Sequence, residues 1–233
     1  MKKHFTIKSV LIALLVMISC TMKAEIVWYY PTDDGFVYTF DTETQEATLD
    51  NYRGEATEVV IPEFVIYEGK EYNVTSLEYC CFGGCSSLTS VEIPSSVTSL
   101  GEACFFGCSS LVSIVVDANN PVYDSREGCN AIIETGSNTM IAGCKSTSIP
   151  PSVTSLGNGC FSGCSSLTSV EIPSSVTSLG NSCFSDCSSL TSVEIPSSVT
   201  SLGDNCFRNC SSLTSVEIPS SVTSLGDYRL VEI

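Results

Sequence analysis

The chain has 233 residues, with 26 acidic residues against 10 lysines and arginines, and its formal net charge is −16. Because such a surface repels phosphates and anionic lipid, neither nucleic-acid binding nor peripheral docking on a membrane is expected. The only histidine, His4, lies in a leader that we expect to be removed, so no Ser-His-Asp or Cys-His unit remains, and no enzyme, cofactor or metal site is expected.

The N-terminal segment, residues 1–24, has the composition of a secretory signal peptide. Lysines precede an apolar run from Val10 to Ile18, which is too short to indicate a membrane span. Cleavage after Ala24 would leave six basic residues against 26 acidic ones, a net charge of −20. Lipidation at Cys20 is the alternative, because Met-Ile-Ser-Cys loosely resembles a bacterial lipobox. Both interpretations predict export.

Residues 25–57 are expected to form a β-hairpin that caps the rest of the chain. The segment is aromatic, and residues such as Trp28 either cover the first coil or act as contact residues for a partner. A degenerate first repeat follows, with EVVIP at Glu58 to Pro62 and YNVTSL at Tyr72 to Leu77. A small loop at Tyr67 to Lys70 separates these two motifs.

A 17-residue string, CSSLTSVEIPSSVTSLG, occurs four times without a change, and the last three copies are 23 residues apart. The copies begin at Cys85, Cys164, Cys187 and Cys210. A fixed period of this length predicts a solenoid, because each unit covers its apolar face with the next. We expect one solenoid domain over residues 58–233. It carries an insertion at about 117–147, since 56 residues separate the Ile-Pro pairs at Pro94 and Pro150.

Each unit is expected to contain two short parallel strands and one turn. In LTSVEIP, Leu88, Val91 and Ile93 share one side, which predicts a half-buried strand with Glu92 facing outward. The segment SSVTSLG is again β-branched and ends at a glycine suited to a tight corner. The Cys-Phe-x-x-Cys stretch is expected to be a helical or 3-10 turn, and the coils are expected to stack in a right-handed sense.

The pattern LTSVEIPSSVTSLGxxCFxxCSS resembles the BspA-type leucine-rich repeat of bacterial cell-surface proteins, a class with a 23-residue unit. The resemblance covers roughly residues 58–228, and the EVVIP and NNPVY segments also look like parts of that family. It implies a leucine-rich-repeat fold and adhesion to host or neighbouring-cell proteins. The chain departs from the family pattern by carrying Cys where alanine is usual before the phenylalanine of each unit.

Ten cysteines form two columns, with one member of each column in every unit. The first column is Cys81, Cys104, Cys160, Cys183 and Cys206, and the second is Cys85, Cys108, Cys164, Cys187 and Cys210. They are either small buried hydrophobic residues or, in an exported chain, partners for disulfides between coils about 4.8 Å apart. Metal binding is not expected, because no histidine completes a tetrahedral set. Cys129 and Cys144, both in the insertion, are the better disulfide candidates.

A row of glutamates is expected on the outward side of the strands. Glu92, Glu171, Glu194 and Glu217 occupy one position of the unit, with Val115 at that position in the second unit. Like charges on neighbouring strands repel, so the row either discourages aggregation of near-identical coils or binds a basic protein segment or Ca²⁺. In the insertion, Tyr123 and Arg126 are further candidate contact residues.

The sequence therefore predicts an exported cell-surface or secreted binding module that mediates adhesion through protein–protein interaction on its repetitive strand face. The alternative is a structural or self-assembling surface scaffold, because the terminal DYRLVEI provides no polar closing coil and would permit end-to-end self-association. A remnant carbohydrate-active or redox enzyme is the third hypothesis, and the missing histidine argues against it. No segment outside the array offers a domain that could form its pocket, which argues against it.

Overall fold

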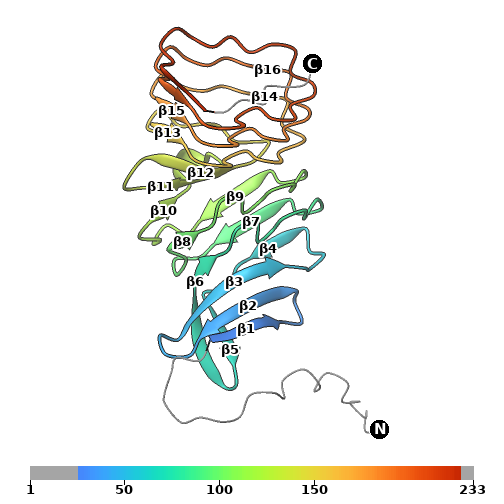
Figure 1. The fold of residues 1–233 in the computed structure, drawn as a ribbon. Coiled ribbons are helices and arrows are strands. Elements are labelled where there is room, and N and C mark those ends of the chain that lie inside the picture. Colours follow the sequence, from blue (N-terminus) through green and yellow to red (C-terminus); the bar gives the residue numbers. More distant parts are fainter. Residues whose placement is uncertain (1–25, 227–233) are drawn as a thin grey trace.

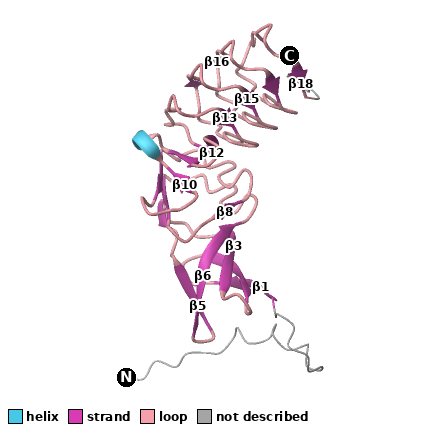
Figure 2. Cartoon of the chain, turned by 90° about the vertical axis from the view of Figure 1, so that its left-hand side faces the viewer, coloured by secondary structure: helices cyan, strands magenta, loops and turns pink. Residues whose placement is uncertain are grey.

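The computed structural model describes residues 26–226, so the expected signal peptide, the lipidation candidate Cys20 and the terminal DYRLVEI lie outside the described residues. The described chain consists of strands and turns that stack from an N-terminal sheet to the last coil (Figure 1). Within these residues the only helical element is a short 3-10 turn, η1 (Arg126–Gly128), which protrudes from the side of the stack (Figure 2).

The N-terminal sheet covers the first end of the array. Its strands are β1 (Ile26–Pro31), β2 (Phe36–Asp41), β3 (Glu46–Tyr52), β5 (Phe64–Tyr67), β6 (Lys70–Leu77) and β8 (Ser99–Leu100). Their order is β1-β2-β3-β6-β5, with β8 also paired to β6. The expected hairpin is thus a three-stranded antiparallel meander, whose last strand pairs in parallel with β6 of the first repeat. Aromatic packing closes this end, since the Phe40 ring lies 4.8 Å from both Tyr67 and Tyr72.

The second sheet contains the Ile-Pro-preceding strands of the first three units. These are β4 (Glu58–Val60), β7 (Ser90–Ile93) and β9 (Ser113–Val116), and all three are parallel. Val91 and Ile93 are buried while Glu92 is exposed, which confirms the predicted alternation. The EVVIP motif also behaves as the first repeat, because Val59 pairs with Val91.

The segment expected to be an insertion forms strands that belong to the stack. They are β10 (Tyr123–Asp124), β11 (Ala131–Glu134) and β12 (Thr139–Gly143). These strands pair antiparallel in that order, and β12 then pairs in parallel with β13 (Ser155–Leu156) of the next unit. The last strand of the segment therefore takes the place that Ser-Leu takes in the regular units.

The verbatim coils, residues 153–226, are the most regular part of the molecule. One side carries β13, β15 (Ser178–Leu179), β17 (Ser201–Leu202) and β18 (Ser224–Leu225), and the other carries β14 (Ser169–Val170) and β16 (Ser192–Val193). Strands that pair here are parallel and 23 residues apart, so the repeat period is the register of the ladder. Each paired segment has two residues, and on the Ser-Leu side a turn after each proline occupies the rest of SSVTSLG. In that turn the Val176 N–H donates to the Pro173 carbonyl at 3.0 Å.

The Cys-Phe-x-x-Cys stretch is not helical, so that part of the expectation is wrong. The residue before the first cysteine has a positive φ, with values of 52° at Ala103, 52° at Ser182 and 54° at Asn205. A positive φ breaks a right-handed helical path. The freed N–H groups instead point to the next coil, as where Phe161 donates to the Cys183 carbonyl at 2.8 Å.

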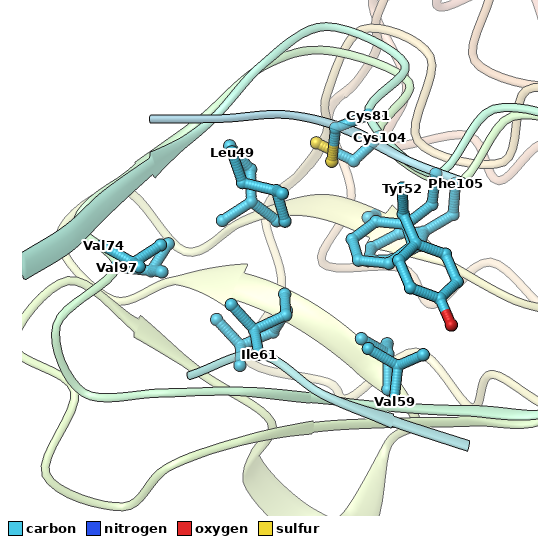
Figure 3. Packing of buried hydrophobic residues seen from close by; sticks show 14 of the residues in the cluster. Leu49, Tyr52, Val59, Ile61, Val74, Cys81, Val97, Cys104 and Phe105 are labelled. Carbon is cyan, nitrogen blue, oxygen red and sulfur yellow. The ribbon is translucent and has the colours of Figure 1, made fainter. Parts of the chain in front are cut away.

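Two hydrophobic clusters fill the interior and meet at the 117–147 segment. The first runs from the cap into β12, and the second runs from Cys129 to Leu213 through the verbatim coils. In the first cluster, equivalent residues of successive units lie over one another, as Cys81 does with Cys104 and Val74 with Val97 (Figure 3). Side chains that recur in the sequence thus become columns in the core.

Phenylalanine forms the largest column of the second cluster. The ring centroids are 5.2 Å apart for Phe161 and Phe184 and 5.4 Å apart for Phe184 and Phe207, with planes within 5° of parallel. The column ends at Gly143, whose N–H donates to the Cys160 carbonyl at 2.8 Å. The Phe161 N–H donates to the Cys183 carbonyl of the next coil in the same way. A Cβ at Gly143 would lie 2.4 Å from the Phe161 ring, so glycine is required where the insertion meets the array.

Candidate functional site

The outward strand face is the set of exposed positions that precede the Ile-Pro pair, or its equivalent, in each unit. Its members are Val60, Glu92, Val115, Ser148, Glu171, Glu194 and Glu217, and all are exposed. The structure thus places the four predicted glutamates on the surface, as expected. It also shows that the row has two parts, which we call the apolar part (Val60, Glu92, Val115) and the acidic part (Glu171, Glu194, Glu217). Ser148 lies between them in chain order.

The apolar part is set by the second sheet. Val60 and Val115 pair with Glu92 from either side, so one carboxylate is flanked by two aliphatic side chains. Val60 is 65% exposed and Val115 is 45% exposed. A groove of about 540 Å³ runs beside them, with Glu63 and Asp117 among its lining residues. The sequence pattern showed Val115 as an exception in the row, but its position across Glu92 from Val60 becomes visible only in the sheet.

The acidic part is set by the verbatim coils. Because Ser169 pairs with Ser192 and Val170 with Val193, the next residues, Glu171 and Glu194, are neighbours in the ladder. Parallel strands are about 4.8 Å apart, so each further coil repeats one carboxylate at about that spacing. Two shallow grooves lie along this part. One of about 630 Å³ includes Glu171 and Glu194, and one of about 590 Å³ includes Glu194 and Glu217.

The coils behind the acidic part are fixed to one another by side-chain and backbone hydrogen bonds. The Thr191 hydroxyl and backbone N–H both donate to the Thr168 carbonyl, at 3.1 and 3.0 Å. The Ser212 hydroxyl donates to the Ser188 carbonyl at 2.6 Å. These bonds run from coil to coil, so the outward carboxylates are held at a regular spacing before any partner binds.

The charge of the acidic part is not neutralised within the described chain. The ion pair between Arg126 and Asp124 lies far from the row in sequence. In the same residues, no three His, Cys, Asp or Glu side chains are grouped so that they could hold a metal ion. The three carboxylates of the acidic part are therefore exposed to solvent along the row.

Two of the predicted contact residues have internal roles. Tyr123 is buried, with 6% exposure, and packs in the first cluster, so its assignment as a surface contact residue is corrected. Burial raises the pKa of its hydroxyl, which also hydrogen-bonds the backbone of Leu100. Sequence reasoning missed this because β10, which places the ring inward through its pairing with β11, has only two residues.

Arg126 and Trp28 differ from Tyr123. The Arg126 guanidinium contacts Asp124 through Nε at 2.8 Å and through Nη2 at 2.6 Å, and Nη1 donates to Asn138 at 2.9 Å. Its donors are thus engaged within the 117–147 segment. Trp28 lies on edge strand β1 and is 74% exposed, so it is the predicted contact residue that the structure leaves most accessible.

The cysteine columns are free thiols, and most are buried. Cys129 and Cys144 are also free, so the disulfide predicted between them is not formed in the structure. The reason is register. Ala131 pairs with Gly143, which sets Cys144 opposite Asn130 rather than Cys129, and successive residues of a strand face opposite sides. Accordingly Cys129 belongs to the second cluster and Cys144 to the first.

The structure also identifies an important residue that sequence reasoning passed over. The Asn120 amide donates to the Pro94 and Val97 carbonyls at 2.9 and 2.8 Å. Its oxygen accepts from the Val122 and Tyr123 N–H groups at 3.0 and 2.8 Å. Asn120 thereby joins the start of the 117–147 segment to the preceding unit. The signal available in the sequence was the NNP turn, which marks a position where a side chain hydrogen-bonds local backbone.

Comparison with protein families agrees with the repeat geometry. The model of the BspA type leucine rich repeat region matches residues 65–127 and 136–232 with six copies. The chain belongs to the BspA-type leucine-rich repeat family. In this family member the matched copies include the parallel ladders described above, and the break at residues 128–135 falls on the β11 side of the 117–147 segment.

One solved structure shows the same fold, and two others are similar to most of this chain. The pneumococcal vaccine antigen PcpA matches with a TM-score of 0.50 and 15% identity, over 88% of this chain and 78% of that chain. The T. pallidum leucine rich repeat protein TpLRR matches with a TM-score of 0.41 and 24% identity, over 84% of this chain and 82% of that chain. A leucine rich cell surface protein from Faecalibacterium prausnitzii matches at 0.45 and 27%, over 85% of this chain and 55% of its own length. A search of curated proteins found no match. In residues 26–226 no helix has the length and apolar character to cross a membrane.

Proposed function

We propose that this chain is an exported binding module that acts at the cell surface or after secretion and mediates adhesion by binding proteins on its outward strand face. The proposal is carried by Glu171 and Glu194, which are neighbours in the ladder, together with Glu217, which is exposed one repeat later. The family, and a cell-surface description printed for one structural neighbour, support it. The charged-then-apolar residues 1–24 provide export, with lipidation at Cys20 as the alternative route to the surface. The right-handed winding predicted for the solenoid belongs to the same proposal.

The partner must supply more than charge. An exposed ion pair contributes about 0.2 to 1 kcal/mol, so three such pairs give at most about 3 kcal/mol. A dissociation constant of about 1 μM requires about 8 kcal/mol. The remaining affinity has to come from apolar contact and from repeated engagement, which the apolar part at Val60 and Val115 and the successive coils both offer. We therefore expect a partner segment that is basic and also carries apolar side chains.

Binding of the purified chain, residues 25 to 233, to an array of extracellular-matrix proteins and glycans at several salt concentrations tests this. A variant with Glu171→Gln, Glu194→Gln and Glu217→Gln removes the acidic part. A second variant with Glu43→Gln, Glu55→Gln and Glu71→Gln removes the same charge from exposed positions elsewhere. We expect binding to a protein that weakens with salt and falls at least tenfold in the first variant alone, since only it deletes the row.

Equal loss of binding in both variants would mean that net charge, and not the row, drives binding.

The alternative function is a structural or self-assembling surface scaffold without a specific ligand. The observation that favours it is the apolar surface of the last described coil, where Ile218 is 37% exposed and Leu225 is 52% exposed. Analytical ultracentrifugation over a concentration series distinguishes the two: end-to-end oligomers with no binding at any salt would replace the adhesion proposal with the scaffold.

A further inference from the structure

The second cysteine column is uniform except at its first member. Cys108, Cys187 and Cys210 are buried, and each thiol lies 3.1 Å from a carbonyl of the preceding coil. Cys164 is also buried, 3.7 Å from the Gly143 carbonyl. Cys85 has the cap below it in place of a regular coil. Its thiol reaches the Tyr52 carbonyl at 3.8 Å and is only partly covered.

Cys85 and Cys108 occupy equivalent positions in adjacent coils that are firmly joined. The Phe82 and Gly84 N–H groups donate to the Cys104 and Phe106 carbonyls at 2.9 and 2.7 Å. Stacked coils place equivalent Cα atoms about 4.8 Å apart, inside the window of about 4.4 to 6.8 Å that a disulfide requires. Interaction with the neighbouring thiol lowers the pKa of Cys85 and raises the pKa of Cys108.

We propose that Cys85 and Cys108 form a redox site, in which a partly exposed attacking thiol and a buried resolving thiol close into a disulfide that joins the unit beginning at Cys85 to the unit beginning at Cys108. The co-reactant is a disulfide, either a small molecule such as oxidised glutathione or the oxidised form of a thiol–disulfide oxidoreductase. The site is independent of the adhesion proposal, because it depends only on the packing of coil on coil.

The reaction balances as two thiol–disulfide exchanges. The Cys85 thiolate attacks one sulfur of the co-reactant, which forms a mixed disulfide and releases one thiolate that takes up a proton. Cys108 then loses its proton to water, and its sulfur attacks the Cys85 sulfur and expels the second thiol. Two protein thiols are oxidised to one disulfide, and the co-reactant disulfide is reduced to two thiols. The lower pKa of Cys85 favours it as the first attacker, since the thiolate is the nucleophile.

The other stacked pairs lack the feature that makes this pair reactive. In those pairs both thiols are buried, with exposures of 7% or less, so a co-reactant cannot reach either partner without opening the coils. Cys80 is also partly covered, but the residue 23 positions later is Ala103, so no stacked thiol can resolve an adduct there. Burial also raises the pKa of Cys80, which disfavours its thiolate.

Mass spectrometry of the folded protein tests the proposal. The protein is reduced, desalted and treated with oxidised glutathione, and it is then alkylated and digested with a glutamate-specific protease. Cleavage after Glu92 and Glu102 places Cys85 and Cys108 on different peptides. We expect loss of two free thiols, one cross-link between Cys85 and Cys108, and an upward shift of the melting temperature that dithiothreitol reverses.

Three variants separate the steps. Cys108→Ser should stop at a glutathione adduct on Cys85, and Cys85→Ser should leave all thiols free. Cys80→Ser, the matched control for a partly covered cysteine, should form the cross-link as the parent does. Circular dichroism of each reduced variant establishes that it is folded. A cross-link at another pair, equal oxidation of both columns, or an unreactive Cys85 in the folded parent would overturn the proposal.

Discussion

The N-terminal half of the molecule and the verbatim coils are held together in different ways. In the N-terminal half, strands such as β3 and β6 have seven and eight residues, and varied aromatic rings pack at many angles. In the verbatim coils the paired segments have two residues each, and the rings lie parallel in one column. The comparison shows that exact repetition lets stacked side chains and turn-to-turn hydrogen bonds replace long strand pairing.

This difference predicts where the verbatim coils are most sensitive. The Phe184 ring has 0% exposure and touches a ring on each side, so Phe184→Ala removes two stacking contacts and opens a cavity. We expect a loss of about 3 to 5 kcal/mol in the free energy of unfolding. Peptide-resolved hydrogen exchange should show faster exchange across residues 153–226 and little change in β1 to β3, because units communicate mainly with their neighbours.

Phe64→Ala is the control for this substitution, since Phe64 lies on edge strand β5 and is 48% exposed. Its cost should be below about 1 kcal/mol, as for surface positions in general. If Phe184→Ala accelerated exchange equally in both halves, the two would unfold as one unit and the distinction drawn here would fail.

The junction between the halves can be broken with a single methyl group. Gly143→Ala would place a Cβ 2.4 Å from the Phe161 ring, which is itself buried with 0% exposure. Overpacking of this kind costs about 1 to 3 kcal/mol, and the close approach to a fixed ring places this site near about 3 kcal/mol. Urea unfolding followed by circular dichroism measures the loss. Gly136→Ala, with no atom within 4 Å, should be close to neutral, and an equal effect at both glycines would contradict the steric argument.

Asn120 joins the start of the 117–147 segment to the preceding unit through hydrogen bonds instead of packing. Asn120→Ala leaves two carbonyls and two N–H groups without their partner. We expect a loss of about 2 kcal/mol, because unsatisfied polar groups cost about 1 to 3 kcal/mol where water reaches them poorly. Asn119→Ala is the matched control, since Asn119 is exposed and contacts only Asp117. Thermal unfolding of the pair should separate them by several degrees; similar melting temperatures would show that water replaces the Asn120 amide.

The smallest predicted effect concerns pH. Burial raises the pKa of Asp124, but hydrogen bonds and charge from Arg126 outweigh it and hold the pKa below its usual range. A lowered folded-state pKa stabilises the fold above the unfolded value of about 3.9, and this contribution is lost as pH falls through the folded value. Because the pair is partly exposed, Asp124→Asn should cost about 1 kcal/mol or less at pH 7.

The measurement for this pair is urea unfolding of the parent and the Asp124→Asn variant between pH 7 and pH 2. The difference between them should shrink as pH falls below about 4. Asp33→Asn, at an exposed turn position, serves as the control and should show no such convergence. A gap that widened toward low pH would show that the sign of the coupling is wrong.

Much of the fold could be predicted from the sequence because the repeat fixes it directly. The 23-residue period became the ladder register, as in Ser155 with Ser178, and alternation in LTSVEIP correctly placed Val91 inward and Glu92 outward. The predicted exposure of Glu171, Glu194 and Glu217 also holds. These features depend on the local pattern of residues and on contact between identical units. Both the pattern and the repeat period can be read directly from the sequence.

The parts that could not be predicted depend on partners that are distant or unlike one another. The backbone at Ala103 has a positive φ, which the Cys-Phe pattern does not signal, so the turn was expected to be helical. The burial of Tyr123 could not be predicted, because it depends on pairing with β11, which follows later in the chain. The sequence therefore assigned Tyr123 to the surface. The separation of Cys129 and Cys144 depends on a one-residue register in the β11–β12 hairpin, where a shift reverses every side chain.

The asparagine ladder along the corner after Ser-Leu-Gly has a consequence for length. The Asn158 oxygen accepts from the Asn181 N–H at 2.8 Å, and the Asn181 oxygen accepts from the Asp204 N–H at the same distance. Each of these corners therefore accepts a hydrogen bond from the next corner in the same way. Removing residues 181–203 would join Gly180 to Asp204 and bring the same donor to Asn158. Such a chain would be shorter by one coil, about 4.8 Å. The length of the stack would change in equal steps, while the side chains presented at each step would stay the same.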